Sequence, residues 1–177
     1  MWAVYSRLLS TRPYTTNTIT AGIISFTGDT LAQAIERRHP NPEHDAWNPQ
    51  RSAALGLWGL TVGGVPMVAW FGFLDRTWPL KSLSHVVSKV MLNQCGAAPV
   101  VNSLFFGWCL WFMEAQTSVE DWLYLQHDLA PTMVRSFALW APLHVFGFKF
   151  VPPQYRVLYL SVGVVGWSTY LSIVGHR

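Results

Sequence analysis

The chain of 177 residues carries few charges, because Asp, Glu, Lys and Arg make up 12% of it, about half the share typical of soluble domains. Aromatic residues reach 15% and include ten tryptophans, which favours a protein with two membrane–water interfaces. The net charge of +3 comes from scattered residues with no basic stripe, which argues against nucleic-acid binding. A chain of this length cannot enclose so much apolar surface in a soluble core.

The first predicted helix covers residues 16–35 and is interrupted by Asp29. Upstream of it, the first 28 residues contain Arg7 and Arg12, many Ser and Thr, and no acid, a composition typical of mitochondrial targeting. We expect any such targeting signal to lie in the mature chain. After a polar loop, residues 52–74 are uncharged and long enough to cross a core of about 30 Å at about 1.5 Å per residue.

The second half of the chain predicts further spans. Residues 90–113 are uncharged, and the acidic residues 114–128 predict an interfacial helix or loop. Residues 136–151 cross only if the flanking Arg135 and Lys149 reach back to the headgroups, whereas residues 157–175 form a clean last span. Pro152 and Pro153 predict a break between these two runs, because proline donates no helical hydrogen bond. The predicted fold is all-α, a single membrane-embedded domain over residues 1–177, with a bundle of four to five transmembrane helices and a short interfacial helix.

Small residues on the spans predict close helix packing. Gly59 and Gly63 are four residues apart, as are Ser52 and Gly56, and the last span contains Gly163 and Gly166. Small residues let helix backbones approach in lipid, and this interpretation is favoured over the general abundance of glycine in membrane helices. The cysteines, Cys95 and Cys109, are too few for a disulfide framework and are expected to be reduced.

Polar side chains within the spans are the candidate functional residues, because ionisable groups are costly in lipid. Asp29 and Gln33 share one helix face, and Lys89 and Asn93 share another, with Gln94 alongside. We predict an ion pair between Asp29 and Lys89. Such a pair is either a buried ion pair that fixes which helices pack together or part of a solvated path, and the buried structural pair is favoured.

His144 lies in the middle of its span without a second ligand at metal-binding spacing, so a hydrogen-bonded role is favoured over a metal site. The sequence contains no hydrolase, zinc-protease or nucleotide-binding motif, and no nucleophile–base pair. We therefore expect no enzyme activity, no metal and no cofactor.

Several short motifs, in order along nearly the whole chain, resemble the Mpv-seventeen / peroxisomal membrane protein twenty-two family. The matching residues are Trp2, Tyr5, Pro13, Ile19-Thr20-Ala21-Gly22, Gly28-Asp29-Thr30-Leu31-Ala32-Gln33, Arg51, Gly56, Gly64, Trp70-Phe71, Leu74-Asp75, Lys89, Gln94, Pro99, Leu139-Trp140, Phe148, Val151-Pro152, Tyr155-Arg156, Trp167 and Tyr170-Leu171-Ser172. The resemblance implies a small multi-span protein of the mitochondrial inner membrane, or alternatively of the peroxisomal membrane, without a cofactor. Some members of the family are described as non-selective or weakly cation-selective channels.

The chain departs from the family at polar positions. Asn93 stands where an Asp is usual, and His144, Gly147 and Ser168 replace a Gln and two Asn. Val68 stands where the family has a His. Val65 stands where the family has a Pro, and the neighbouring Pro66 can take over the role of that proline. Because packing residues are kept while polar side chains change, we expect an accessory subunit in a larger mitochondrial inner-membrane complex, in contact with lipids and other membrane subunits. The alternative is a free-standing solute channel.

Overall fold

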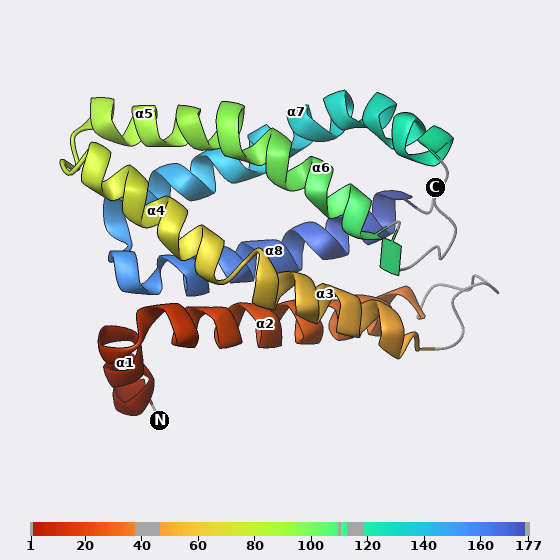
Figure 1. The fold of residues 1–177 in the computed structure, drawn as a ribbon, viewed down its shortest axis with the longest axis horizontal. Coiled ribbons are helices and arrows are strands. Elements are labelled where there is room, and N and C mark those ends of the chain that lie inside the picture. Colours follow the sequence, from red (N-terminus) through yellow and green to blue (C-terminus); the bar gives the residue numbers. More distant parts are fainter. Residues whose placement is uncertain (1, 38–46, 110, 113–118, 176–177) are drawn as a thin grey trace. The chain divides into compact units, whose positions relative to one another are not determined.

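The computed structural model describes residues 2–37, 47–109, 111–112 and 119–175, and the described part of the chain is helical, without strands. Its elements in chain order are α1 (Trp2–Thr11), α2 (Pro13–Glu36), α3 (Pro49–Thr61), α4 (Val65–Thr77), α5 (Leu83–Leu92), the π-helix η2 (Asn93–Ala97), α6 (Ala98–Cys109), α7 (Val119–Phe150) and α8 (Pro153–Gly175) (Figure 1). The predicted all-α class is therefore confirmed.

The chain divides into two compact units. Unit 1 contains residues 1–70 and 157–177, and unit 2 contains residues 71–156. The core of unit 1 includes Leu9, Ala21, Ala32, Ala54, Leu55, Val157 and Leu160, and that of unit 2 includes Phe71, Leu74, Val86, Val90 and Phe148. The expectation of a single domain over residues 1–177 stays a prediction.

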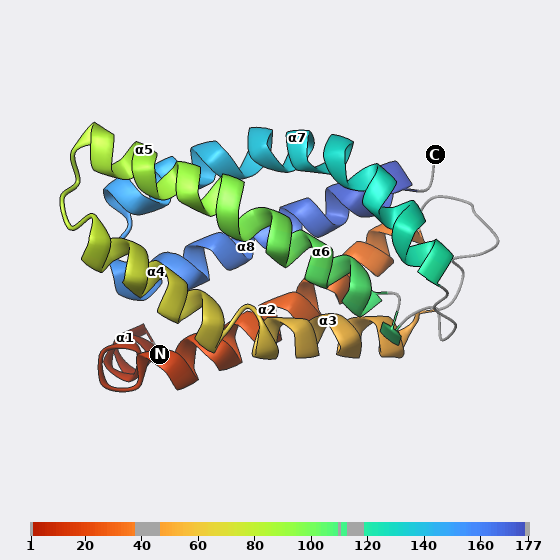
Figure 2. The same cartoon turned by 45° about the horizontal axis from the view of Figure 1, so that its top comes forward.

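Within unit 1, α2 and α3 lie side by side and run in opposite directions (Figures 1 and 2). Their closeness follows from small residues, because a Cβ on Gly59 would lie only 2.6 Å from the backbone oxygen of Ala21. The last helix also packs here, since a Cβ on Gly28 would lie 2.8 Å from Val165. The short α1 attaches to the start of α2 through a hydrogen bond of 3.2 Å between the Tyr5 and Thr20 hydroxyls.

The predicted span of residues 52–74 is not one uninterrupted helix. The first helix, α3, ends at Thr61, and α4 begins at Val65, with a turn between them. The turn follows from packing, because Gly64 lies against the side chain of Thr18 where any Cβ would collide. Pro66 then fits the first turn of α4, where its missing N–H leaves no bond unmade.

The stretch Pro49–Thr77, of 29 residues, is the one run of described residues that is long and apolar enough to cross a membrane. Only 22% of its most apolar window is buried, whereas the core helix of a soluble protein would be mostly covered. This exposure favours a lipid-facing span.

Within unit 2, α5, η2 and α6 follow each other without a loop, and α7 packs along α5 and α6 (Figure 2). Of the predicted interfacial element of residues 114–128, residues 119–128 are helical and form the first turns of the 32-residue α7, so they continue into the next predicted span without a break, and their interfacial position stays a prediction. Residues 114–118 lie outside the described part. The predicted break at the proline pair is confirmed, since α7 ends at Phe150 and α8 begins at Pro153.

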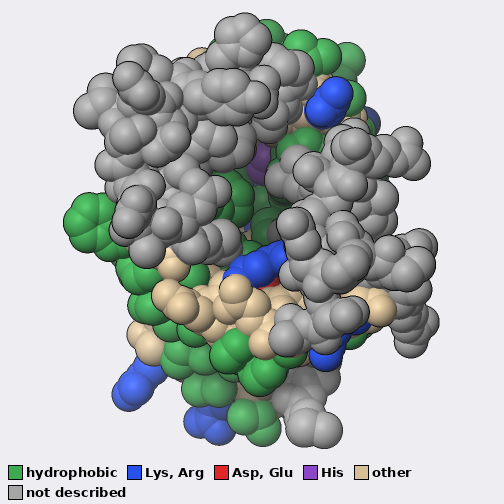
Figure 3. Space-filling view, turned by 90° about the vertical axis from the view of Figure 1, so that its right-hand side faces the viewer, with side chains coloured by type: hydrophobic (Ala, Val, Ile, Leu, Met, Phe, Trp, Pro, Cys, Tyr) green, Lys and Arg blue, Asp and Glu red, His purple; other side chains and the backbone are tan. Residues whose placement is uncertain are grey.

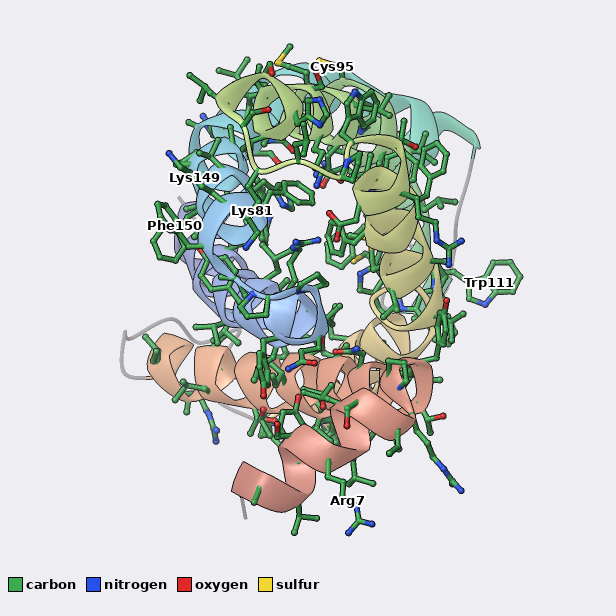
Figure 4. All side chains as sticks on the ribbon, turned by 90° about the vertical axis from the view of Figure 1, so that its left-hand side faces the viewer. Arg7, Lys81, Cys95, Trp111, Lys149 and Phe150 are labelled. Carbon is green, nitrogen blue, oxygen red and sulfur yellow. The ribbon has the colours of Figure 1, made fainter. Side chains whose placement is uncertain are left out.

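Large apolar side chains are exposed on several helices. Trp111 is 74% exposed and Val134 72% exposed. Both Trp111 and Phe150 point away from the ribbon in Figure 4, and Figure 3 shows hydrophobic side chains among the described residues of another face. Exposed apolar side chains in this number are suited to contact with lipid or with a membrane partner.

Candidate functional site

A first buried network, which we call the Asp29 cluster, joins Asp29 and Gln33 of α2 to Arg51 and Ser52 of α3. Asp29 is 1% exposed, and its Oδ2 accepts hydrogen bonds of 2.7 Å from the Ser52 hydroxyl and the Gln33 amide. Its other oxygen, Oδ1, lies 2.8 Å from Arg51 Nε. The buried carboxylate is therefore neutralised and held by groups from both helices.

Gln33 extends this cluster to the beginning of α3. Its side-chain carbonyl accepts a bond of 2.7 Å from the Asn48 N–H, and its amide donates one of 3.0 Å to the Asn48 carbonyl. The Asn48 side chain in turn accepts a bond from the Arg51 N–H and so caps α3. The cluster consequently fixes where α3 begins against α2.

The predicted pair between Asp29 and Lys89 is wrong. Asp29 pairs with Arg51, and Lys89 Nζ lies 2.6 Å from Asp75 Oδ1. The physical reason is proximity in the fold, because Arg51 begins the helix that packs on α2, and Asp75 ends the helix that precedes α5.

A second network, the Asp75 cluster, consists of Asp75, Lys89 and Arg156 in unit 2. Asp75 Oδ1 accepts from Lys89, and Asp75 Oδ2 lies 2.7 Å from Arg156 Nη1. Arg156 Nε also donates a bond of 3.4 Å to the Gly147 carbonyl. Lys89 is 3% exposed and Arg156 2% exposed, so both cations are buried around one carboxylate.

The ring of Phe148 supports both cations. Lys89 Nζ lies 5.4 Å from its centroid and Arg156 Cζ 4.6 Å from it. A positive charge over an aromatic face is attracted by the ring quadrupole, more strongly when water is excluded. Phe71 meets Phe148 edge to face at 5.8 Å and closes the apolar side of the cluster.

Asn93 and His144 form a third buried contact, also in unit 2, with 2.9 Å between Asn93 Nδ2 and His144 Nε2. The imidazole is stacked on Phe148 and lies 5.9 Å from the Trp140 ring. Asn93 and the buried Gln94 belong to the π-helix η2, a distortion frequent at functional sites. Among the described residues, no group of three His, Cys, Asp or Glu side chains is arranged for a metal ion.

The four packing glycines have different surroundings. Gly59 lies against α2, and a Cβ on Gly63 would lie 3.5 Å from Ala21 Cβ. Gly166, by contrast, is exposed and has open space where a Cβ would be, and Gly163 is half-buried. The predicted packing role of Gly163 and Gly166 therefore stays a prediction, because no described side chain lies within 4 Å of a Cβ on Gly166.

Sequence reasoning did not find the partners of the buried charges. From the sequence, Asp75 and Arg156 stand out only as positions that match the family. A signal was available, since both stand at the ends of apolar runs, where charges of opposite sign can meet inside a bundle. For Arg51 and Ser52, the sequence shows only that they follow Pro49 at the beginning of a helix, which does not identify Asp29 as their partner.

A double-mutant cycle tests the corrected pairing. We expect Asp29→Asn and Arg51→Gln to be non-additive, with a coupling free energy between roughly 0.5 and 3 kcal/mol, because each removes the same ion pair. Thermal unfolding in detergent measures it. Asp29→Asn combined with Lys89→Met is the control and should be additive, since the two residues have different partners. Additivity of the first pair together with coupling of the second would restore the original pairing.

The sequence matches curated proteins along most of its length. The model of the Mpv17 / PMP22 family matches residues 111–172. Protein SYM1 of Mycosarcoma maydis is 31% identical over 156 residues, which cover 88% of this chain and 76% of that protein. This chain belongs to the Mpv17 / PMP22 family.

Other members match the whole chain. Mitochondrial inner membrane protein Mpv17 of Bos taurus and that of Homo sapiens are each 28% identical over 179 residues, covering 100% of this chain and 98% of either protein. These names confirm the predicted mitochondrial inner-membrane localisation. No solved structure matches the chain.

The signature positions of the family have structural roles in this chain. Arg156 belongs to the Asp75 cluster, and Trp140 contacts His144. Pro152 separates α7 from α8, and Trp167 is a half-buried residue of α8.

Proposed function

We propose that this family member is a non-enzymatic accessory subunit of a larger assembly in the mitochondrial inner membrane, where it acts by packing rather than by conducting ions. The observation that carries the proposal is that its buried charges lie in side-chain networks. Asp29, Lys89 and Arg156 are each at most 3% exposed and each pairs with an opposite charge. A side chain that lines an aqueous path must face water instead.

The lengths of the helices support a bundle with several crossings. A helix of 24 residues, such as α2, extends about 36 Å at about 1.5 Å per residue, which exceeds a hydrocarbon core of about 30 Å. The last helix, α8, has 23 residues, and α7 has 32. We propose that α2, the α3–α4 pair, the α5–α6 run, α7 and α8 cross the membrane, which gives five spans.

The exposed apolar side chains support contact with lipids and with other membrane subunits. Leu83 and Val162 are 68% and 65% exposed, and they lie on different helices. A soluble monomer rarely exposes large contiguous apolar patches. A membrane subunit that acts by packing requires a stable interior, which the polar clusters provide. It also requires an apolar exterior for contact with lipids and partners.

A solute channel is the second candidate, and two backbone features favour it. The α3–α4 pair is a broken helix, and non-helical backbone at membrane depth is tolerated only where it is buried in protein or lines a cavity. The π-helix η2 places the polar Asn93 and Gln94 within the α5–α6 run. For the α3–α4 pair, the packing of Gly64 against Thr18 already accounts for the break without a cavity.

Reconstitution separates the two candidates. We expect purified protein in a planar bilayer to give no more current than protein-free membranes, because its buried charges are held in ion pairs. Single-channel currents that recur across preparations and disappear in Lys89→Met or His144→Ala would contradict the accessory role. An exposed-residue variant, Lys81→Met, serves as the control for non-specific loss of charge.

A further inference from the structure

The Asp75 cluster contains more positive than negative charge. Among the described residues, Asp75 is the one carboxylate that pairs with Lys89 or Arg156, so the cluster has two cations for one anion. Burial leaves little water to solvate the difference, since Lys89 and Arg156 are 3% and 2% exposed. An isolated buried charge costs several kcal/mol in real proteins, so a site of this kind favours a neutralising ligand.

Hydrogen-bond donors are in surplus at the same place. An ammonium has three N–H groups and a guanidinium five. The contacts of these groups are one bond from Lys89 to Asp75, one from Arg156 to Asp75 and one from Arg156 to Gly147. Several donors therefore have no acceptor among the described residues, and the acceptor that would satisfy them is an anion.

His144 adds an independent observation. The residue is only 5% exposed, and its Nδ1 is buried without a hydrogen-bond partner among the described residues. Because the Asn93 amide nitrogen can only donate, Nε2 of the neutral imidazole accepts, and the proton is on Nδ1. The imidazole stacks on Phe148, the ring that also carries Lys89 and Arg156. A buried N–H donor without an acceptor thus belongs to the same aromatic core as the two cations.

We infer that the Asp75 cluster binds an oxyanion of the phosphate class, with Arg156 and Lys89 as its charged contacts. Arginine presents a planar fork that matches phosphate oxygens, and lysine binds phosphate as a point charge. One added negative charge, as on a phosphodiester, neutralises the cluster. Asp75 has a side chain that is 25% exposed, so the cluster reaches the surface of its unit at the carboxylate. The inference is independent of the accessory role, because a packed subunit and a channel can both bind an anion.

Asn93 decides whether the charge remains unbalanced. It is 4% exposed, contacts His144, and lies one helical turn after Lys89. A carboxylate at this position would supply the missing negative charge from the protein itself. Asn93→Asp, which hardly changes the side-chain size, therefore competes with an external anion for the same cations.

Binding is measured on the full chain in nanodiscs. In phosphatidylcholine discs, sodium phosphate is titrated against sodium chloride at equal ionic strength, and protein stability is followed by thermal unfolding. In a second arm without phosphate, an anionic phospholipid replaces part of the phosphatidylcholine, and native mass spectrometry counts retained lipid. Stabilisation by phosphate identifies a free oxyanion as ligand, whereas retention of the anionic lipid alone identifies its headgroup, and either result supports the site.

The variant comparison gives the inference its decisive outcome. We expect Asn93→Asp to weaken binding by at least about tenfold while unfolding at or above the temperature of the wild type in anion-free discs. Asn17→Asp is the matched control, because Asn17 is 2% exposed and belongs to the other unit, and it should keep the wild-type affinity. Equal effects of chloride and phosphate with no retained lipid, or unchanged binding in Asn93→Asp, would overturn the inference.

Discussion

Asp75→Asn is expected to destabilise the protein by about 3 to 5 kcal/mol, the cost typical of breaking a buried ion pair from one side. The asparagine keeps the shape but removes the charge that Lys89 and Arg156 share, at 2.6 and 2.7 Å respectively. Both cations would then remain buried over Phe148 without a counter-charge, and cation–π attraction of about 2 kcal/mol compensates for only part of the loss.

Thermal unfolding in detergent measures this effect. The double variant Asp75→Asn with Lys89→Met should regain part of the lost stability, because one of the two unpaired charges is removed. Lys81→Met is the control, since Lys81 is exposed and its loss should change the unfolding free energy by less than about 0.5 kcal/mol. A change of that small size for Asp75→Asn would show that the cluster does not stabilise unit 2.

Gly59→Ala is expected to be the second most damaging substitution, at about 1 to 3 kcal/mol, because it overpacks the contact between α2 and α3. Its Cβ would lie 2.6 Å from the Ala21 oxygen and 2.7 Å from the Ser25 hydroxyl. The oxygen belongs to the backbone and cannot rotate away, so the two helices must separate. That separation also strains the Asp29 cluster, which joins the same helices.

Gly166→Ala is the matched control, because no atom of the described residues lies within 4 Å of its Cβ position. Alanine should be neutral there or stabilise α8 by up to about 1 kcal/mol through its higher helix propensity. Unfolding curves of the two variants, recorded in the same detergent, give the comparison. If Gly59→Ala were tolerated as well as Gly166→Ala, the close approach of α2 and α3 would be disproved.

The sequence predicted where the apolar helices lie, though not their exact bounds, because apolar length and proline position are local properties. The break before Pro153 is an example, since two consecutive prolines remove two helical N–H donors and clash with the preceding turn. The turn between Thr61 and Val65 was not predictable in the same way. It depends on Gly64 meeting Thr18, a contact between residues far apart in the chain.

The candidate site shows the same difference. Asp29 and Gln33 were recognised because they are four residues apart on one helix, and they bond to each other as that spacing allows. Their partners Arg51 and Ser52 lie on another helix, so only the packing of α3 on α2 identifies them. Lys89 was expected as the partner of Asp29 from its opposite charge and its polar helix face, but neither property identifies the helix that packs against α2.

The most direct test of the accessory role is to determine what surrounds the protein in its membrane. The full chain, tagged and extracted from mitochondria with two different mild detergents, is sized on a native gel and analysed by quantitative mass spectrometry. We expect a band much larger than the 20.0 kDa chain, with the same partner proteins at the same stoichiometry in both detergents. A chain that migrates alone, without partners in either detergent, would contradict it.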